Sequence, residues 1–140
     1  MIPLHTAEVE VLGRILGWAT AQPTVRAVIL ESSRAIPDAP RDALTDYDIA
    51  FLVTDPEQWR TRGDWVQALG EPLLRVRDVV DVDALPVQND MVLLADGAKI
   101  DCSFWPVAIA ERIRQRGVLP DEWDHGYRVL LDKDGLTDSW

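Results

Sequence analysis

The sequence predicts one domain of the α/β (α+β) class, in which helices and strands share a core. Its 140 residues are 47% hydrophobic and 27% charged, which is typical of one globular domain that folds without disulfides or a structural metal. Segments with helical and with strand-like periodicity alternate along the chain. The pair Asp96-Gly97, between two short apolar segments, is the strongest local signal because Asp-Gly favours the type I′ turn of an antiparallel hairpin.

The expected elements follow one another without an internal repeat, a low-complexity tract or a linker, so we expect a single domain over 1–140. They are a helix over 7–21, a strand over 25–30, an irregular loop over 31–45, a strand over 46–53, one or two short helices within 56–69, a strand over 73–77, hairpin strands over 91–95 and 98–104, a helix over 106–116 and a strand over 127–131.

End signals and periodicity support the helices. Thr6 can cap the first helix, whose apolar residues recur at helical spacing until Pro23 ends it. Pro56 and Pro106 suit the first turns of the later helices. Gly117 follows the arginine-rich end of the last helix, where a left-handed residue commonly stands.

The strands are predicted where β-branched and aliphatic residues gather. Val25–Leu30 is dense in such residues and predicts a largely buried strand. The segment 46–53 begins polar and becomes apolar. The segments 91–95 and 98–104 flank the Asp-Gly turn, so we expect them to pair antiparallel.

Charge and cysteine content exclude several functions. With 24 acidic and 14 basic side chains, the net charge of −10 opposes nucleic-acid binding and favours a cationic small molecule. The single Cys102 cannot form an internal disulfide, and together with two histidines it offers too few ligands for a zinc site. Neither a membrane span nor a signal peptide is recognisable. We therefore expect a cytoplasmic protein that does not bind a membrane.

Three aspartates are candidate metal ligands. Asp46 and Asp48 stand two apart at the polar start of a predicted strand, so both side chains point to one face. Asp101 interrupts another strand and would join them if the two strands were neighbours. Three converging carboxylates can hold the two metal ions of a phosphoryl or nucleotidyl transfer site. The alternative is that these are ordinary solvated carboxylates, which arise readily among 24 acidic residues.

A serine-rich turn follows the first strand. Ser32 and Ser33, with the backbone N–H groups around them, can hold phosphate oxygens, and Arg34 can add charge-assisted hydrogen bonds. The alternative is an ordinary turn with a surface arginine.

Taken in order, these motifs resemble a known family. The segments that carry the resemblance are Val-Ile-Leu-Glu-Ser-Ser-Arg, Thr-Asp-Tyr-Asp-Ile-Ala-Phe-Leu-Val-Thr-Asp, Asp-Gly-Ala-Lys-Ile-Asp and Leu-Leu-Asp-Lys-Asp-Gly. Together they are similar to the N-terminal domain of the aminoglycoside 6-adenylyltransferases, which are streptomycin-modifying members of the polymerase-beta-like nucleotidyltransferase superfamily. The usual turn of the superfamily is Gly-Ser, and this chain has Ser32 in place of the glycine.

The resemblance implies a mixed β-sheet flanked by helices, the polymerase-beta-like nucleotidyltransferase fold. It also implies ATP as co-substrate, two Mg²⁺ ions and transfer of AMP to an aminoglycoside hydroxyl with release of pyrophosphate, as in antibiotic resistance. Asp46, Asp48 and Asp101 would be catalytic and bind the metal ions, and Asp101 would also orient or deprotonate the acceptor hydroxyl. The residues that would contact the phosphates are Ser32, Ser33, Arg34 and Lys99.

The resemblance also implies a helical C-terminal domain beyond the Asp-Lys-Asp-Gly turn, which is absent from this chain. Two other functions therefore stay open. The chain could be an isolated or degenerate domain that binds a nucleotide or a partner, for example as a homodimer through its C-terminal face, or it could modify a protein hydroxyl. Trp123 and Trp140 would then be exposed anchors for the missing domain or the partner.

Overall fold

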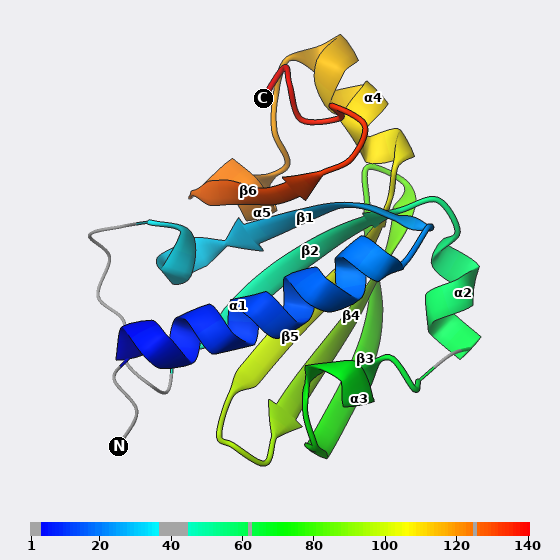
Figure 1. Ribbon diagram of the computed structural model, residues 1–140. Coiled ribbons are helices and arrows are strands. Elements are labelled where there is room, and N and C mark those ends of the chain that lie inside the picture. Colours follow the sequence, from blue (N-terminus) through cyan, green and yellow to red (C-terminus); the bar gives the residue numbers. More distant parts are fainter. Residues whose placement is uncertain (1–3, 37–44, 62, 125) are drawn as a thin grey trace.

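The computed structural model describes residues 4–36, 45–61, 63–124 and 126–140. The described residues form one mixed sheet of six strands in the order β3-β4-β5-β2-β1-β6, with helices on both faces (Figure 1). The elements are α1 (Leu4–Ala21), β1 (Val25–Glu31), the 3-10 helix η1 (Ser32–Ala35), β2 (Tyr47–Val53), α2 (Pro56–Thr61), α3 (Val66–Leu69), β3 (Pro72–Val82), β4 (Leu85–Leu94), β5 (Lys99–Pro106), α4 (Ala108–Arg116), α5 (Asp121–Asp124) and β6 (Tyr127–Asp132).

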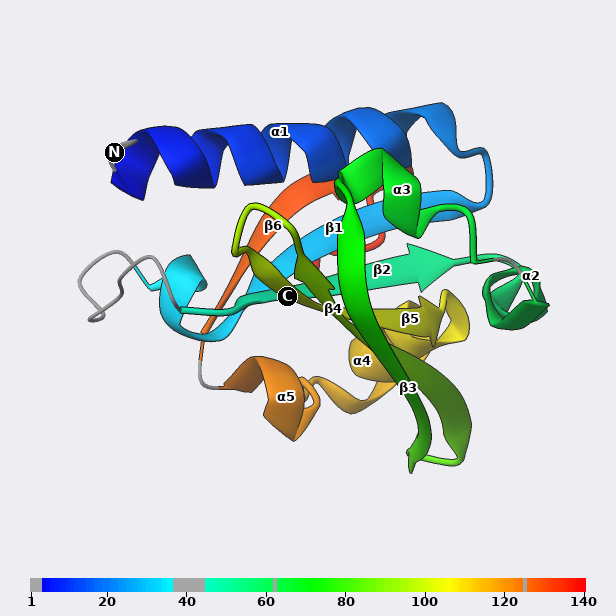
Figure 2. The same cartoon turned by 90° about the horizontal axis from the view of Figure 1, so that it is seen from below.

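The centre of the sheet combines both strand directions. β1 pairs antiparallel with β2 and with β6, whereas β2 pairs parallel with β5. β5, β4 and β3 then continue antiparallel to the far edge. Figure 2 shows α1 on one side of the sheet and α4 and α5 on the other. The mixed α/β fold expected from the resemblance is thus confirmed.

The face of the sheet beneath α1 is filled by aromatic side chains. Phe104 stacks with Phe51 and Trp59, with ring centroids 5.2 and 5.5 Å apart. Trp18 and Trp65 add edge-to-face contacts to the two phenylalanines, a favourable arrangement for aromatic pairs. This core closes the α1 face of the sheet, and a second, smaller core lies on the other face.

The prediction that Trp123 and Trp140 are exposed anchors is wrong. Trp123 is 1% exposed and lies between Trp105 and Trp140, at centroid distances of 4.7 and 4.9 Å. Trp140 is itself half-buried. The short helix α5, where the sequence shows only an acidic cluster, turns Trp123 into this second core.

Two strands are longer than expected because their connecting turn carries no sequence signal. The segments 73–77 and 91–95 belong to β3 and β4, an antiparallel hairpin that spans residues 72–94. Asp83 and Ala84 in its turn both have positive φ angles, 52° and 64°. A type I′ turn requires this of its two central residues, and glycine or asparagine usually supplies it. The antiparallel hairpin around Asp96-Gly97 is confirmed, but its turn is not of type I′, because of these two residues only Gly97 has a positive φ angle.

The ends of α1 differ in how well the sequence predicted them. The helix begins at Leu4, so Thr6 lies inside it and not at its cap. At the other end, the ammonium of Lys133 donates to the carbonyl oxygens of Ala19 and Gln22, at 3.1 and 2.9 Å. These carbonyls have no partner within the helix, and a cation there also complements the helix dipole. The Leu-Leu-Asp-Lys-Asp-Gly motif therefore ties β6 to the first helix.

Part of the expected loop over 31–45 can be compared with the structure. Its first residue ends β1 and the next four form η1, whereas residues 37–44 lie outside the described part. Among the described residues, no helix combines the length and the apolar character needed to cross a membrane.

Candidate metal and nucleotide site

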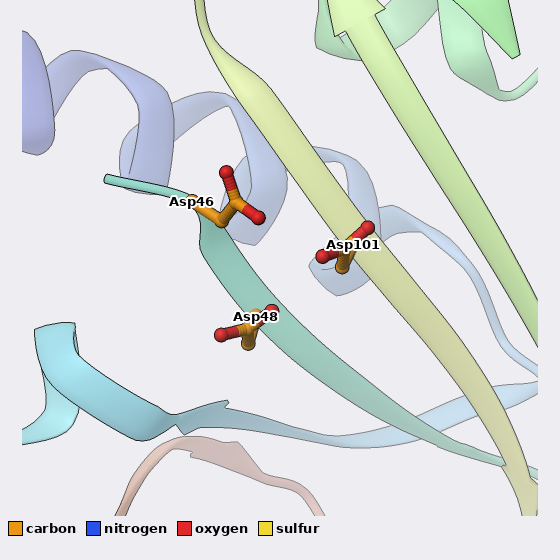
Figure 3. Close-up of side chains that lie close together, drawn as sticks. All are labelled: Asp46, Asp48 and Asp101. Atoms are coloured by element: carbon orange, nitrogen blue, oxygen red, sulfur yellow. The ribbon is translucent and has the colours of Figure 1, made fainter. Parts of the chain in front are cut away.

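The three predicted aspartates meet on the face of the sheet opposite α1. Asp46 directly precedes β2, Asp48 lies on β2, and Asp101 lies on β5. The parallel pairing of β2 with β5 sets Asp48 directly opposite Asp101. Each residue offers a carboxylate oxygen within 4.8 Å of the others, and all three side chains are partly exposed. Figure 3 shows the three carboxylates grouped over the adjoining strands.

The alternation of side chains along these strands explains why the three carboxylates lie on the face of the sheet opposite α1. Tyr47 and Ile49, which flank Asp48, are buried on the α1 face, as are Ile100 and Cys102, which flank Asp101. Burial raises the pKa of the Cys102 thiol well above its usual value. This cysteine is a core residue rather than a reactive one.

The carboxylates destabilise one another's charged forms. Burial and the neighbouring Asp48 and Asp46 raise the pKa of Asp101 to about 6. Burial also raises the pKa of Asp48, although hydrogen bonds with Asp101 and Ser32 oppose the rise. Such a cluster gains stability when a cation enters, because the cation offsets both the repulsion and the cost of burial.

Glu31 is a fourth acidic side chain at the site, and no role for it was predicted from the sequence. It ends β1 directly opposite Asp48, so Glu31, Asp48 and Asp101 form a row across three strands. Burial raises its pKa to about 8, and Asp48, Glu122 and Asp101 contribute to the rise, which the Trp123 indole opposes. The only sign in the sequence that Glu31 belongs to the site is its position directly before Ser32 and Ser33.

Lys99 faces the site but pairs with a carboxylate. Its ammonium lies 3.1 Å from Asp46, and this contact raises the pKa of the lysine. The expected phosphate contact would require Lys99 to exchange Asp46 for a phosphate oxygen. Because both side chains of the pair are partly exposed, such an exchange is inexpensive.

Ser32 adopts the backbone conformation that the glycine of the superfamily would favour. Its φ is 61°, in the left-handed region, and its side chain hydrogen-bonds with Asp48. The backbone N–H of Ser32 donates to the carbonyl oxygen of Gly126 at 3.3 Å, so this N–H is not directed at the site. The side chain of Ser33 lies outside the described part of the structure.

Arg34 does not reach the carboxylate group. Its side chain is buried, with an ion pair of 2.9 Å to Glu8. Two of its nitrogens donate to the carbonyl oxygen of Thr45 at 2.7 and 3.2 Å, and its guanidinium lies 3.8 Å from the centre of the Tyr47 ring. The structure therefore places Arg34 as a brace for the start of β2, in contrast to the expected phosphate contact.

A mixed sheet with carboxylates on two adjacent strands is the arrangement that the resemblance to the polymerase-beta-like nucleotidyltransferases implies. The sequence model of the streptomycin adenylyltransferase family matches residues 6–140. The chain therefore belongs to that family.

Similar proteins carry the same description. The chain is 30% identical over 132 residues to an aminoglycoside 6-adenylyltransferase of Campylobacter jejuni and 29% identical over 135 residues to one of Bacillus subtilis (strain 168). These matches cover 91% and 93% of this chain but 43% and 45% of the relatives. The crystal structure of an aminoglycoside 6-adenyltransferase from Bacillus subtilis is also similar, with a TM-score of 0.65 and 25% identity over 91% of this chain and 41% of that one. The chain thus spans less than half the length of these relatives.

Proposed function

We propose that this site transfers AMP from ATP to a hydroxyl group of a streptomycin-like aminoglycoside, with release of pyrophosphate. The observation that carries the proposal is the convergence of Asp46, Asp48 and Asp101 within 4.8 Å on adjacent strands, in a chain of the streptomycin adenylyltransferase family. Relatives that cover nearly the whole chain are named for adenylyl transfer to aminoglycosides.

The donor set fits magnesium. Mg²⁺ prefers a few carboxylate oxygens together with water and phosphate oxygens, and the carboxylates here are partly exposed and repel one another. We assign Asp46 and Asp48 to two ions and Asp101 to one of them. Bound magnesium would offset the charge of the triphosphate and make an acceptor hydroxyl more acidic.

The protein side chains have separate roles in this scheme. Asp101 orients the acceptor hydroxyl and takes up its proton, because it lies beside Asp48 at the centre of the group. Ser32 holds Asp48 by a hydrogen bond and, with Ser33, offers a hydroxyl to the triphosphate. Lys99 moves from Asp46 to a phosphate oxygen when the nucleotide binds.

Charge supports a cationic acceptor. The chain has a net charge of −10, and Asp46, Asp48 and Asp101 gather three carboxylates at the site itself. Such a field raises the local concentration of a polycation such as an aminoglycoside. ATP as co-substrate and a single buried, reduced cysteine suit a cytoplasmic protein.

A second candidate function is a nucleotide-binding or partner-binding module without turnover of an aminoglycoside. The observation that favours it is length, because the chain covers only 43% and 45% of two relatives. Residues that complete the acceptor site in those proteins could lie in their remaining parts. A protein hydroxyl would be a third choice of acceptor.

Calorimetry with Mg²⁺ and a non-hydrolysable ATP analogue tests nucleotide binding, and labelled ATP with streptomycin tests transfer. We expect binding and transfer by the unmodified chain and loss of both in Asp48→Asn. Glu10→Gln is a matched control, since it removes one charge from an exposed position on α1 and should change neither. Binding without transfer to any aminoglycoside would support the module. Absence of metal-dependent nucleotide binding would exclude both adenylyl transfer and a nucleotide-binding module.

A further inference from the structure

The edge strand β3 exposes an apolar surface and an unpaired backbone. Within the described residues it pairs only with β4 and runs for 11 residues. Figure 2 shows it as the outermost strand. Its apolar side chains are between 40% and 65% exposed at Leu73, Leu74, Val76, Val79 and Val80. Long edge strands are usually protected by charged side chains, proline, a bulge or a covering element. Within the described residues, β3 has Pro72, a register shift at its start and charged side chains among the exposed apolar ones.

Opposite charges occupy the two halves of β3. Arg75 and Arg77 lie in the first half, and Asp78 and Asp81 lie in the second. Both arginines share one buried carboxylate, that of Asp90, which is 3.2 Å from each Nε atom. One carboxylate neutralises only one of them, so the first half keeps a positive charge. A strand of this kind attracts an antiparallel copy of itself and repels a parallel one.

We propose that β3 pairs antiparallel with β3 of a second copy of this chain, so that a two-fold dimer forms through a continuous sheet. Residues that face each other across strands must point to the same side of the sheet. A register centred on Val79 satisfies this rule and sets Val79 opposite the partner's Val79. Arg77 then faces the partner's Asp81, and Val76 faces the partner's Val82, with no two like charges directly opposed.

The register of the sheet relates this interface to the metal site. Val76 lies opposite Met91, and Met91 lies opposite Asp101, so Val76 shares the face of the carboxylates. In the dimer, both sites would open on the same face of the joined sheet. Leu74, Val76 and Val80 of the two copies would lie between the sites on this face, together with Asp78, next to where the substrates bind.

Sedimentation and a cysteine variant test the dimer and its register. The unmodified chain is expected to sediment as a dimer at micromolar concentration. In Val79→Cys, the two introduced thiols would meet at the two-fold axis, where opposite Cα atoms lie about 4.5–5.5 Å apart, within the span of a disulfide. Mild oxidation should therefore link it covalently, whereas Val9→Cys, 55% exposed on α1, should stay unlinked. Cys102 is buried and does not compete.

A charge reversal separates this register from others. Asp81→Arg places the new arginine opposite the partner's Arg77 on both sides of the two-fold axis. This repulsion should weaken the dimer at least about tenfold. Asp78→Arg faces the partner's Val80 and should change affinity less than about twofold. Circular dichroism would confirm that both variants fold. A monomer at all concentrations, a dimer that Val79→Cys does not link, or equal effects of the two reversals would each overturn the proposal, and a monomer would show that something other than a second copy covers β3. None of these readouts depends on enzymatic activity.

Discussion

Replacing Glu31 by glutamine should make the metal-free protein more stable at alkaline pH. The folded state raises the pKa of Glu31 from 4.5 to about 8, chiefly through burial. The folded protein therefore binds this proton more tightly than the unfolded chain does. The stability contributed by Glu31 is fully present below pH about 4.5 and is lost as the pH rises through about 8.

The expected size of the effect follows from the two pKa values. The ionisation of Glu31 lowers the free energy of unfolding by RT ln[(1 + 10^(pH−4.5))/(1 + 10^(pH−8))]. This penalty is about 1 kcal/mol at pH 5, about 3 kcal/mol at pH 7 and about 5 kcal/mol at pH 9. Glutamine keeps the shape of the side chain without the charge. The advantage of Glu31→Gln should thus grow by as much as about 4 kcal/mol between pH 5 and pH 9.

Urea unfolding in the presence of a chelator at these pH values measures the effect. The matched control is Glu122→Gln, which removes the same charge from a neighbouring exposed residue of α5 and should change stability by less than about 0.5 kcal/mol. Added Mg²⁺ should restore much of the alkaline stability of the unmodified protein. If Glu31→Gln and the unmodified chain lost stability in parallel from pH 5 to pH 9, the burial of a charged Glu31 beside Asp48 would be refuted.

Substitutions at three further positions test other parts of the structure. Arg34→Ala removes the ion pair between Arg34 and the buried Glu8 and should cost about 3–5 kcal/mol in urea unfolding. Arg34→Lys should cost less and lower kcat with little change in the KM for ATP; a large rise in that KM would instead indicate direct phosphate contact. Lys99→Gln removes the ion pair between Lys99 and Asp46. The affinity of the nucleotide-free protein for Mn²⁺, measured by electron paramagnetic resonance, should rise by up to about fivefold. An unchanged affinity would mean that Lys99 does not compete with the metal. Ala84→Gly relieves a positive φ of 64° and should raise the free energy of unfolding by about 0.5–1 kcal/mol, seen as a higher midpoint of thermal unfolding. A lower midpoint would argue against the tight turn between β3 and β4.

The candidate metal ligands could be predicted because the signal is local. The spacing of Asp46 and Asp48 and the alternation around Asp101 place each carboxylate on a polar strand face. The two strands are neighbours because of contacts between residues about fifty positions apart in the chain. Only the resemblance to a family indicated that the strands lie side by side. The structure confirms that they pair in parallel.

The surroundings of the site were harder to predict for the same reason. Arg34 was assigned to phosphate because its partner Glu8 lies 26 residues earlier in the chain, where local sequence shows no relation. Glu31 is buried by β6 and α5, which follow it by about ninety residues. The length of β3 was missed because Asp83 and Ala84 turn the chain without glycine.

The pairing of β2 with β5 makes the spacing of the proposed ligands a property of the hydrophobic core. Asp48 and Asp101 face each other because Ile49 and Phe51 pack beside Cys102 and Phe104 on the reverse side of the same strands. A slip of one residue would turn the Asp101 carboxylate into that apolar layer. Substitutions in the aromatic interior, far from any ion, should therefore alter metal affinity whenever they loosen the alignment of these two strands.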